Sequence, residues 1–267
     1  MRCCRTNFRL RLVQTLQEEL DSSSSAQVVG SLCVDGYQGC YTDSMQVFFE
    51  RREELAPGIW QYYFRPEQVI DFVPGQYVDL YLSGITGDAR GASRTFSITS
   101  LPSDPSFSFV TKHFELQTPY KHALERLTEA DDARIGEAMG DLVLPKSTET
   151  PLIFVAGGIG MASYASMLKD LLTRKEERPV FFFYALRSRR EQIYRELTNA
   201  YPLALMETVL APNRLSAQDI KDTTPPNGLI YLSGSQNFVE GLQAELETLG
   251  ALRSRIIFDY YDGYMEL

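Results

Sequence analysis

The pattern of hydrophobic and polar positions changes near residue 147. Between residues 44 and 147, short runs rich in aromatic and β-branched residues are separated by Pro/Gly turns such as APG, VPGQ and SGITGDARG. We expect strands in MQVFFERRE, IWQYYFRP, QYVDLYL, RTFSITS and SFSFVTKHF, a helix in TPYKHALERLTEA and a last strand near ARIGEAM. Several short strands with such turn signals predict a small β-barrel.

After this point the pattern alternates strands with helices. LIFVA is a continuous apolar run, as in a strand that is buried on both faces. Helices are predicted in ASYASMLKDLLTR, REQIYRELTNA, LSAQDI and FVEGLQAELETLG, and strands in PVFFFYAL, ALMETVL, GLIYLSG and RIIFDYY. This alternation predicts an α/β domain with a doubly wound parallel sheet. The expected domains are therefore 44–147 and 148–267, preceded by an N-terminal extension, 1–43.

The predicted strand RTFSITS carries an arginine, an aromatic ring and a hydroxyl at its head. Side chains alternate between the two faces of a strand, so two groups form. They are Arg94, Phe96 and Ile98 on one face and Thr95, Ser97 and Thr99 on the other. By itself this pattern is typical of an edge strand with a surface arginine.

Length and charge narrow the classes of function. A chain of 267 residues is natural for two domains, and its net charge of -9 argues against generic nucleic-acid binding, which needs a basic face. No apolar run approaches the roughly 18 residues of a membrane span. We therefore expect a cytoplasmic monomer with no integral membrane segment.

All four cysteines lie in the N-terminal extension: Cys3, Cys4, Cys33 and Cys40. They contain no Cys-x-x-Cys pair, so we predict no metal site and no disulfide framework, and we expect a reducing compartment. MRCCRTNFRLRLVQTLQ has four arginines and lacks the apolar centre of a secretory signal. This segment is either an amphipathic targeting helix or an extra helix or mobile arm, and we favour the latter. The linker DSSSSA follows it.

AGGIGMASY lies between a buried strand and a helix. Its glycines, Gly157, Gly158 and Gly160, let backbone N–H groups approach a ligand, and the helix N-terminus that follows favours anions. The motif is not the full G-x-G-x-x-G fingerprint, so an ordinary tight turn is the alternative. Its place after the first strand of the parallel sheet favours a dinucleotide site.

LRSRREQIY follows the next strand and offers Arg187, Ser188, Arg189 and Arg190 before Glu191. Folds that bind NAD often place an acid near this position for the ribose hydroxyl, whereas arginines accommodate a 2′-phosphate. In an acidic chain these arginines point to an anionic ligand and favour NADP over NAD. A solvated basic loop is the alternative.

TPYKHAL places Lys121 in the first turn of a predicted helix, after Thr118 as N-cap and Pro119. The helix dipole disfavours a cation there, and a bound phosphate would remove the conflict. An exposed lysine that is tolerated at small cost is the alternative.

Two further segments, YLSGS and DYYDGY, lie near two later strands. They either admit and stack a flat ring or are an ordinary turn and part of the core.

Several other catalytic classes find no support. His113 and His122 are the only histidines, so no Ser–His–acid set is plausible, and no P-loop, kinase or metalloprotease motif occurs. Redox chemistry with organic cofactors remains, because it needs no acid or base from the protein.

Seven motifs occur in one order: PGQY, R-x-F-S, a T-x-Y-K helix, GD-x-x-LP, AGGIG, a SGS turn and D-x-x-x-GY. Over residues 44 to 267 this order resembles the ferredoxin–NADP reductase superfamily, and within it the bacterial flavodoxin/ferredoxin reductase-like proteins. The resemblance implies an all-β antiparallel flavin-binding barrel followed by an α/β domain that binds NADP or NAD. It also implies FAD as the flavin and a flavin-dependent NAD(P)H oxidoreductase.

The resemblance further implies roles for single residues. Arg94 would pair with a flavin phosphate, Phe96 would lie against the flavin, and Ser97 would hydrogen-bond near flavin N5. Ser233 matches a position near the nicotinamide, so Ser97 and Ser233 are the catalytic candidates. The other cofactor-binding candidates are Gln76, Tyr77, Thr95, Thr111, His113, Thr118, Tyr120, Lys121, Gly158, Ile159, Gly160, Arg187, Ser188, Arg189, Gly234, Asp259, Tyr261 and Tyr264.

Three motifs depart from the family's pattern. Phe96 stands where tyrosine is common, which removes one hydroxyl contact and keeps the aromatic surface. Ala162 and Ser163 replace a usual threonine and proline, and Ser233–Gly234–Ser235 replaces a usual cysteine–glycine–proline. The last two departures lie in the nicotinamide half. No C-terminal cysteine cluster exists, so we do not expect the iron–sulfur extension of some relatives.

The expected reaction passes hydride from NAD(P)H to the flavin and electrons on to a protein or small acceptor, with ferredoxin or flavodoxin as candidates. One alternative is a flavin-binding electron-transfer or regulatory subunit of a larger complex. Another alternative is a ferric-chelate reductase on the same scaffold.

Overall fold

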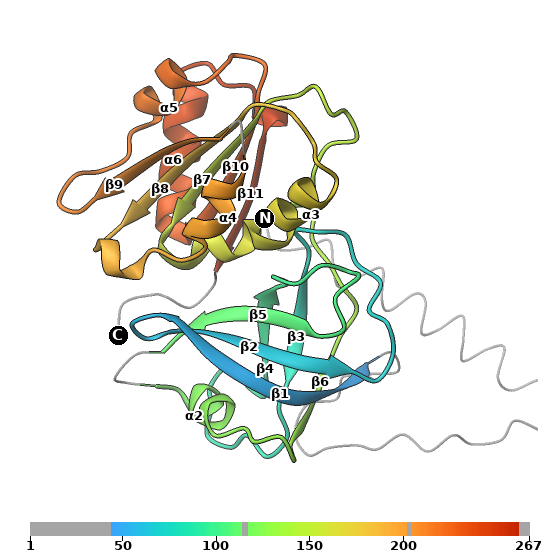
Figure 1. The fold of residues 1–267 in the computed structure, drawn as a ribbon. Helices are drawn as coiled ribbons and strands as arrows, with labels where there is room; N and C mark the ends of the chain where they lie inside the picture. Colours follow the sequence, from blue (N-terminus) through green and yellow to red (C-terminus); the bar gives the residue numbers. More distant parts are fainter. Residues whose placement is uncertain (1–43, 114–116, 202–203, 262–267) are drawn as a thin grey trace, which may run out of the picture. The chain divides into compact units, whose positions relative to one another are not determined.

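The computed structural model describes residues 44–113, 117–201 and 204–261 (Figure 1). All of these residues belong to one compact unit. The predicted N-terminal extension, its cysteines and its arginine-rich segment lie outside the described residues, as does Tyr264.

The first half of the described chain is a six-stranded antiparallel sheet with the order β4-β3-β6-β1-β2-β5. Its strands are β1 (Met45–Ala56), β2 (Ile59–Pro66), β3 (Tyr77–Tyr81), β4 (Ser93–Ser97), β5 (Phe107–Lys112) and β6 (Asp132–Ile135). The two end strands also meet, because Ile98 forms a bridge with Phe109 and the Thr99 N–H donates to the Ser108 carbonyl at 2.8 Å. The sheet therefore curls into the predicted barrel.

Aromatic side chains fill this barrel. Phe109 of β5 stacks on Phe96 of β4 at 4.0 Å between ring centroids and on Tyr62 of β2 at 5.5 Å. Both Tyr62 and Phe109 have no exposed surface. The short helix α2 (Pro119–Glu125) follows β5 and contributes the buried Tyr120 to the same core.

The second half is a five-stranded parallel sheet with the order β11-β10-β7-β8-β9. Its strands are β7 (Leu152–Gly157), β8 (Val180–Leu186), β9 (Ala204–Leu210), β10 (Leu229–Ser235) and β11 (Ile256–Tyr261). The order reverses between β7 and β10, and ligands of open α/β sheets bind at the carboxyl ends of the strands at such a point.

Helices cover both faces of this sheet (Figure 1). They are α3 (Ala165–Thr173), α4 (Arg195–Ala200), α5 (Ala217–Thr223) and α6 (Gln236–Thr248), with the 3-10 segments η1 (Gly158–Tyr164), η2 (Arg189–Glu191) and η3 (Arg253–Arg255). Alternate residues of β7 point to opposite faces. Phe154 packs in the core that contains α3, whereas Ile153 and Val155 pack in the core that contains α5 and α6.

Two helices are shorter than the sequence predicts. The helix in TPYKHALERLTEA ends at Glu125, and the Thr128 N–H and hydroxyl donate instead to the Asp131 carboxylate at 2.8 and 2.7 Å, which competes with helix formation. In REQIYRELTNA the α-helix begins only at Arg195, because Tyr194 has a left-handed backbone with φ of 57°. The Tyr194 hydroxyl donates to the Gln61 side chain of the barrel at 3.1 Å, a tertiary contact that no local pattern reveals.

The predicted fold class, an antiparallel barrel followed by a doubly wound parallel sheet, is confirmed. Of the helices in the described part of the chain, none has the length and apolar character that a membrane crossing requires.

Candidate functional site

Arg94 is buried on β4, and groups of its own chain surround it. Its Nη2 lies 2.6 Å from Asp88 Oδ1, and the two side chains are 7% and 3% exposed. Its Nη1 donates to three backbone carbonyls, those of Arg90 at 3.3 Å, Gly91 at 3.1 Å and Ser93 at 2.6 Å. The guanidinium therefore has a fixed direction and a buried counter-ion.

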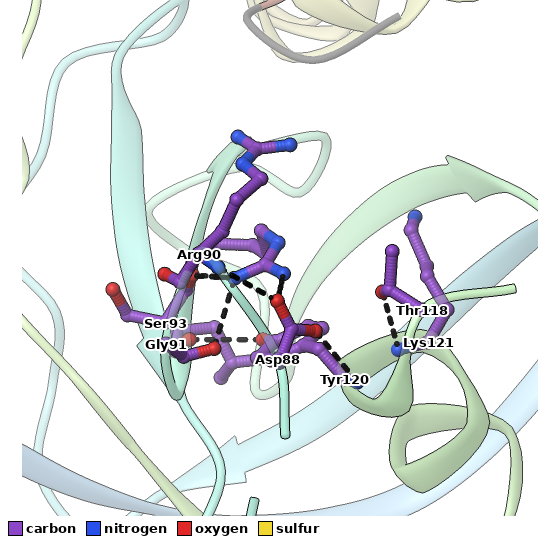
Figure 2. A network of polar contacts seen from close by, with 9 residues as sticks. Asp88, Arg90, Gly91, Ser93, Thr118, Tyr120 and Lys121 are labelled. Carbon is purple, nitrogen blue, oxygen red and sulfur yellow. Dashed lines mark hydrogen bonds and ion pairs between the residues drawn. The ribbon is translucent and has the colours of Figure 1, made fainter. Parts of the chain in front are cut away.

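Asp88 is a site residue that the sequence did not single out. Its carboxylate also accepts from the backbone N–H of Arg90 at 2.9 Å and of Tyr120 at 3.0 Å (Figure 2). Burial alone would raise the pKa of Asp88, but these N–H donors and the Arg94 guanidinium outweigh burial and lower the pKa. The only local signal is an acid six residues before Arg94, within the glycine-rich loop between β3 and β4.

Lys121 is the cation that lacks a carboxylate here. The Lys121 N–H donates to the Thr118 hydroxyl at 3.4 Å, which caps α2 as predicted. Its ammonium contacts the Thr111 hydroxyl, and among the described residues no carboxylate lies within ion-pair distance of it. Burial, followed by the positive charges of Arg94 and Arg90, lowers the pKa of Lys121 to about 7. This cluster of cations can hold an anionic group.

Aromatic rings lie beside this cluster. Phe96 is 6% exposed and stacks on Phe109 at 4.0 Å between ring centroids, and the Lys121 ammonium lies 5.6 Å from the Phe96 centroid. The Tyr120 hydroxyl donates to the Leu80 carbonyl at 2.9 Å, so Tyr120 holds α2 against β3.

Three predicted residues are occupied with other contacts. The Thr95 hydroxyl donates to Asp79 Oδ1 at 2.6 Å on the exposed side of β4, away from Arg94. His113 Nε2 lies 3.0 Å from the Tyr62 hydroxyl, and burial lowers the pKa of the imidazole. Gln76 accepts the Val73 N–H at 2.8 Å and thereby braces the turn before β3, whose first residue is Tyr77.

Glycines bring the loop after β7 against β10. A Cβ on Gly160 would lie 2.2 Å from the Ser233 carbonyl oxygen, so only glycine permits this approach. Gly158 has φ of +55°, and a Cβ there would meet nothing within 4 Å, so its backbone faces open space. Ile159 lies between them, and Gly234 follows Ser233 at the end of β10. This is the carboxyl edge of the sheet, as the sequence predicts.

Four hydroxyl groups from distant segments meet at this edge. Ser163 Oγ lies 3.1 Å from Ser97 Oγ, 3.0 Å from Ser233 Oγ and 2.8 Å from Tyr261 Oη. Tyr261 Oη also lies 3.3 Å from Ser97 Oγ. Burial, followed by the charge of Asp259, raises the pKa of Tyr261, so its hydroxyl keeps its proton. Ser163 was noted in the sequence only as a departure from a family pattern.

The arginine loop follows β8, also at the carboxyl edge. Arg187, Arg189 and Arg190 are exposed, and in the described part of the chain none of them forms an ion pair. Ser188 accepts the Arg190 N–H at 3.3 Å and so caps η2. The acid that follows, Glu191, is paired with Lys112 of β5 at 2.6 Å.

The relationship of this fold to known proteins follows from sequence and structure comparisons. No family model matches the chain. The flavohemoprotein of Bacillus cereus is 25% identical over 258 residues, which cover 84% of this chain and 62% of that protein. The structure of ferredoxin–NADP+ reductase from Plasmodium falciparum aligns with a TM-score of 0.69 and 16% identity, over 82% of this chain and 96% of that one. This chain has the fold of the ferredoxin–NADP reductase superfamily.

Other similar proteins give the same result. Flavohemoglobin from Malassezia yamatoensis, whose structure contains FAD and heme, aligns with a TM-score of 0.70 and 18% identity, over 82% of this chain and 60% of that one. The phenol hydroxylase P5 protein of Acinetobacter pittii is 30% identical over 159 residues, which cover 56% of this chain and 42% of that protein. This chain spans about three fifths of the length of the Bacillus cereus flavohemoprotein and of flavohemoprotein A from Dictyostelium discoideum. The resemblance predicted from the order of motifs is confirmed.

The residues of this reductase fold fit a flavin and a nicotinamide dinucleotide in two respects. Lys121 is a cation beside Arg94 with no carboxylate partner in the described part of the chain, as a phosphate-binding group requires. Gly158 leaves open space at the carboxyl edge of the parallel sheet, where a dinucleotide backbone would approach. In one respect the fit is incomplete, because Asp88 already neutralises Arg94.

Proposed function

We propose that this chain is an FAD-dependent NAD(P)H oxidoreductase. The observation that carries the proposal is the contact of Ser97, from the barrel, with Ser163 at 3.1 Å, at the carboxyl edge of the parallel sheet, where Ser163 in turn contacts Ser233 at 3.0 Å. A flavin held by the barrel and a nicotinamide held by the sheet would face each other at such a junction. When bound, the flavin accepts a hydride from the nicotinamide and delivers electrons to an acceptor.

The barrel residues would hold the flavin by its phosphates and its ring. Lys121 and Arg94 supply positive charge for the phosphates, and the charged forms make the stronger hydrogen bonds. Phe96 supplies an aromatic surface, and Ser97 a hydroxyl for the reactive edge. FAD is favoured over FMN because the Thr118–Lys121 segment matches a pyrophosphate-binding segment of the superfamily.

The residues of the sheet would hold the nicotinamide dinucleotide. Gly158 and Gly160 allow the backbone to approach its pyrophosphate, and Ser233 lies beside the junction with Ser97. Arg187 and Arg189 are exposed and unpaired within the described residues, which favours a ligand with a 2′-phosphate. Positioning the two rings would provide the rate, because hydride transfer needs no acid or base from the protein.

A module of a larger electron-transfer system is a second candidate. The chain covers only 62% of the flavohemoprotein and 42% of the phenol hydroxylase P5 protein that it resembles. The acceptor would then be a domain or subunit of that system, whereas ferredoxin or flavodoxin would serve a free-standing reductase. No observation of this structure favours a ferric-chelate reductase.

The test is the visible spectrum of the purified protein, reconstituted with FAD where needed, before and after anaerobic NADPH and then NADH. A yellow protein that bleaches supports the reductase, and the faster donor identifies the preferred dinucleotide. A yellow protein that resists both donors supports a flavin-binding subunit. A colourless protein that takes up neither FAD nor FMN contradicts the proposal.

A further inference from the structure

Ser163 is the centre of the hydroxyl cluster of Ser97, Ser163, Ser233 and Tyr261. Three of the four contacts in this cluster involve its Oγ, at 3.1, 3.0 and 2.8 Å. A hydroxyl has one proton to donate and two lone pairs that accept, so three partners saturate Ser163. Ser163 and Ser233 have no exposed surface and Ser97 is 5% exposed, so water does not compete for these contacts.

Counting protons shows what the cluster can offer a ligand. It contains four hydroxyl protons and four contacts of 3.3 Å or less, so satisfying these contacts uses every proton. The bonds then run around the triangle of Ser97, Ser163 and Tyr261, and Ser233 donates to Ser163. One lone pair remains free on Ser97, but no proton does. The cluster can therefore accept another hydrogen bond without loss, and can donate one only by breaking an internal contact.

We propose that Ser163 is a positioning residue that keeps Ser97 from donating, so that the cluster favours a bound group which itself donates a hydrogen bond. The inference rests on the proposed function, in which Ser97 faces flavin N5. That nitrogen accepts a hydrogen bond in the oxidised flavin, and it carries a proton after two electrons and a proton arrive as hydride. The cluster thus stabilises the reduced flavin relative to the oxidised flavin and raises its midpoint potential.

The same count predicts the effect of each substitution. Ser163→Ala leaves three protons for the two contacts of Tyr261 with Ser97 and Ser233, so one donor is free and Ser97 can donate to the flavin. Tyr261→Phe leaves three protons for two contacts and also frees one donor. Ser233→Ala leaves three protons for three contacts and frees none. A purely structural role for the cluster would not separate Ser233→Ala from the other two variants.

The experiment is a redox titration of the FAD-loaded protein with dithionite and a reference dye, without nicotinamide. We expect Ser163→Ala and Tyr261→Phe to shift the equilibrium towards oxidised flavin by up to about tenfold, which is about 30 mV for two electrons. Ser163→Thr, which keeps the hydroxyl, and Ser233→Ala should retain the wild-type potential. Ser166→Ala is the matched control, because Ser166 is buried in the adjacent helix and accepts the Gly75 N–H at 2.9 Å outside the cluster.

Two results would overturn the inference while leaving the proposed function intact. In the first, the protein binds flavin, and Ser163→Ala has the same midpoint potential as Ser166→Ala. The other is a shift in Ser233→Ala as large as that in Ser163→Ala. A wild-type protein that takes up no flavin contradicts both the proposed function and the inference.

Discussion

The Asp88 carboxylate lies 2.6 Å from the Arg94 guanidinium, and both side chains are almost fully buried. The same carboxylate accepts the backbone N–H of Tyr120, so it bridges β4 and the start of α2 (Figure 2). A flavin phosphate is predicted to pair with Arg94. It would therefore have to share this guanidinium with Asp88 or displace the carboxylate from it.

Asp88→Asn is expected to strengthen the binding of flavins that carry phosphate. The amide keeps the shape of the side chain and removes the negative charge that competes for Arg94. We expect FAD and FMN to bind roughly tenfold or more tightly and riboflavin to bind as before, since one charge-assisted hydrogen bond corresponds to about 1.5–3 kcal/mol. Quenching of flavin fluorescence gives the three dissociation constants.

Two control variants show whether Asp88 competes with the phosphate or orients Arg94. Asp79→Asn removes a carboxylate that bonds Thr95 on the exposed side of the neighbouring strand, and it should leave all three constants unchanged. Arg94→Ala should weaken FAD and FMN and reduce the flavin content of the purified protein. If Asp88→Asn weakens FAD in the same way as Arg94→Ala, then Asp88 orients the arginine and does not compete with the phosphate.

The affinity for FAD is expected to fall as the pH rises above about 7. Burial and the neighbouring Arg94 and Arg90 hold the pKa of Lys121 at about 7, so at higher pH the free protein carries a neutral amine there. A bound phosphate favours the ammonium form, so binding must then take up a proton, and affinity falls by up to tenfold per pH unit. His113 does not contribute to this pH dependence, because burial lowers the pKa of its imidazole and leaves it neutral.

Lys121→Met should remove this pH dependence, and riboflavin should not show it in either protein. The free wild-type protein should also become more stable between about pH 7 and 10. In that range the unfolded lysine binds a proton that the folded lysine has released, so the free energy of unfolding rises with pH. Denaturant titrations at several pH values test this, and equal slopes in wild type and Lys121→Met would contradict it.

Arg189→Glu is expected to weaken NADPH more than NADH. Arg189 is exposed after β8 and has no ion-pair partner in the described chain, so its charge is available to a 2′-phosphate. We expect KM for NADPH to rise roughly tenfold or more, as for the loss of a charge-assisted hydrogen bond, and KM for NADH to change little. Arg195→Glu, an exposed charge reversal at the start of α4, is the control. Equal effects on both dinucleotides would remove the 2′-phosphate argument.

The sequence predicts those features that depend on local pattern. The alternating strands of the barrel, the buried strand before AGGIG and the arginine loop after the next strand lie where they are expected. Parallel strands fix which loops share an edge, so the glycine loop and the SGS turn could be placed together without knowledge of side chains. The surface arginine expected for an isolated RTFSITS strand is wrong, because Arg94 is 8% exposed.

The sequence could not predict contacts that depend on distant segments. Asp88 meets Arg94 and Tyr120 only because the glycine-rich loop folds back over β4 and reaches α2. Ser163 meets Ser97, which is 66 positions away, and Tyr261, which is 98 positions away, and no periodicity relates such positions. Ser163, which stands in place of a proline, indicates a change in the loop. Only the register of β4, β10 and β11 shows which hydroxyls Ser163 meets.

Gly160→Ala is expected to slow reduction by both NADPH and NADH while FAD binding persists. The added Cβ would lie 2.2 Å from the Ser233 carbonyl, so η1 must move away from β10 and separate Ser163 from Ser233. Overpacking of this kind costs about 1–3 kcal/mol, so the protein should still fold. Gly136→Ala is the matched control, because its backbone has a negative φ and its Cβ would meet nothing within 4 Å. Rapid-mixing measurements of flavin bleaching test the prediction, and equal rates in the two variants would show that this close approach does not serve the nicotinamide.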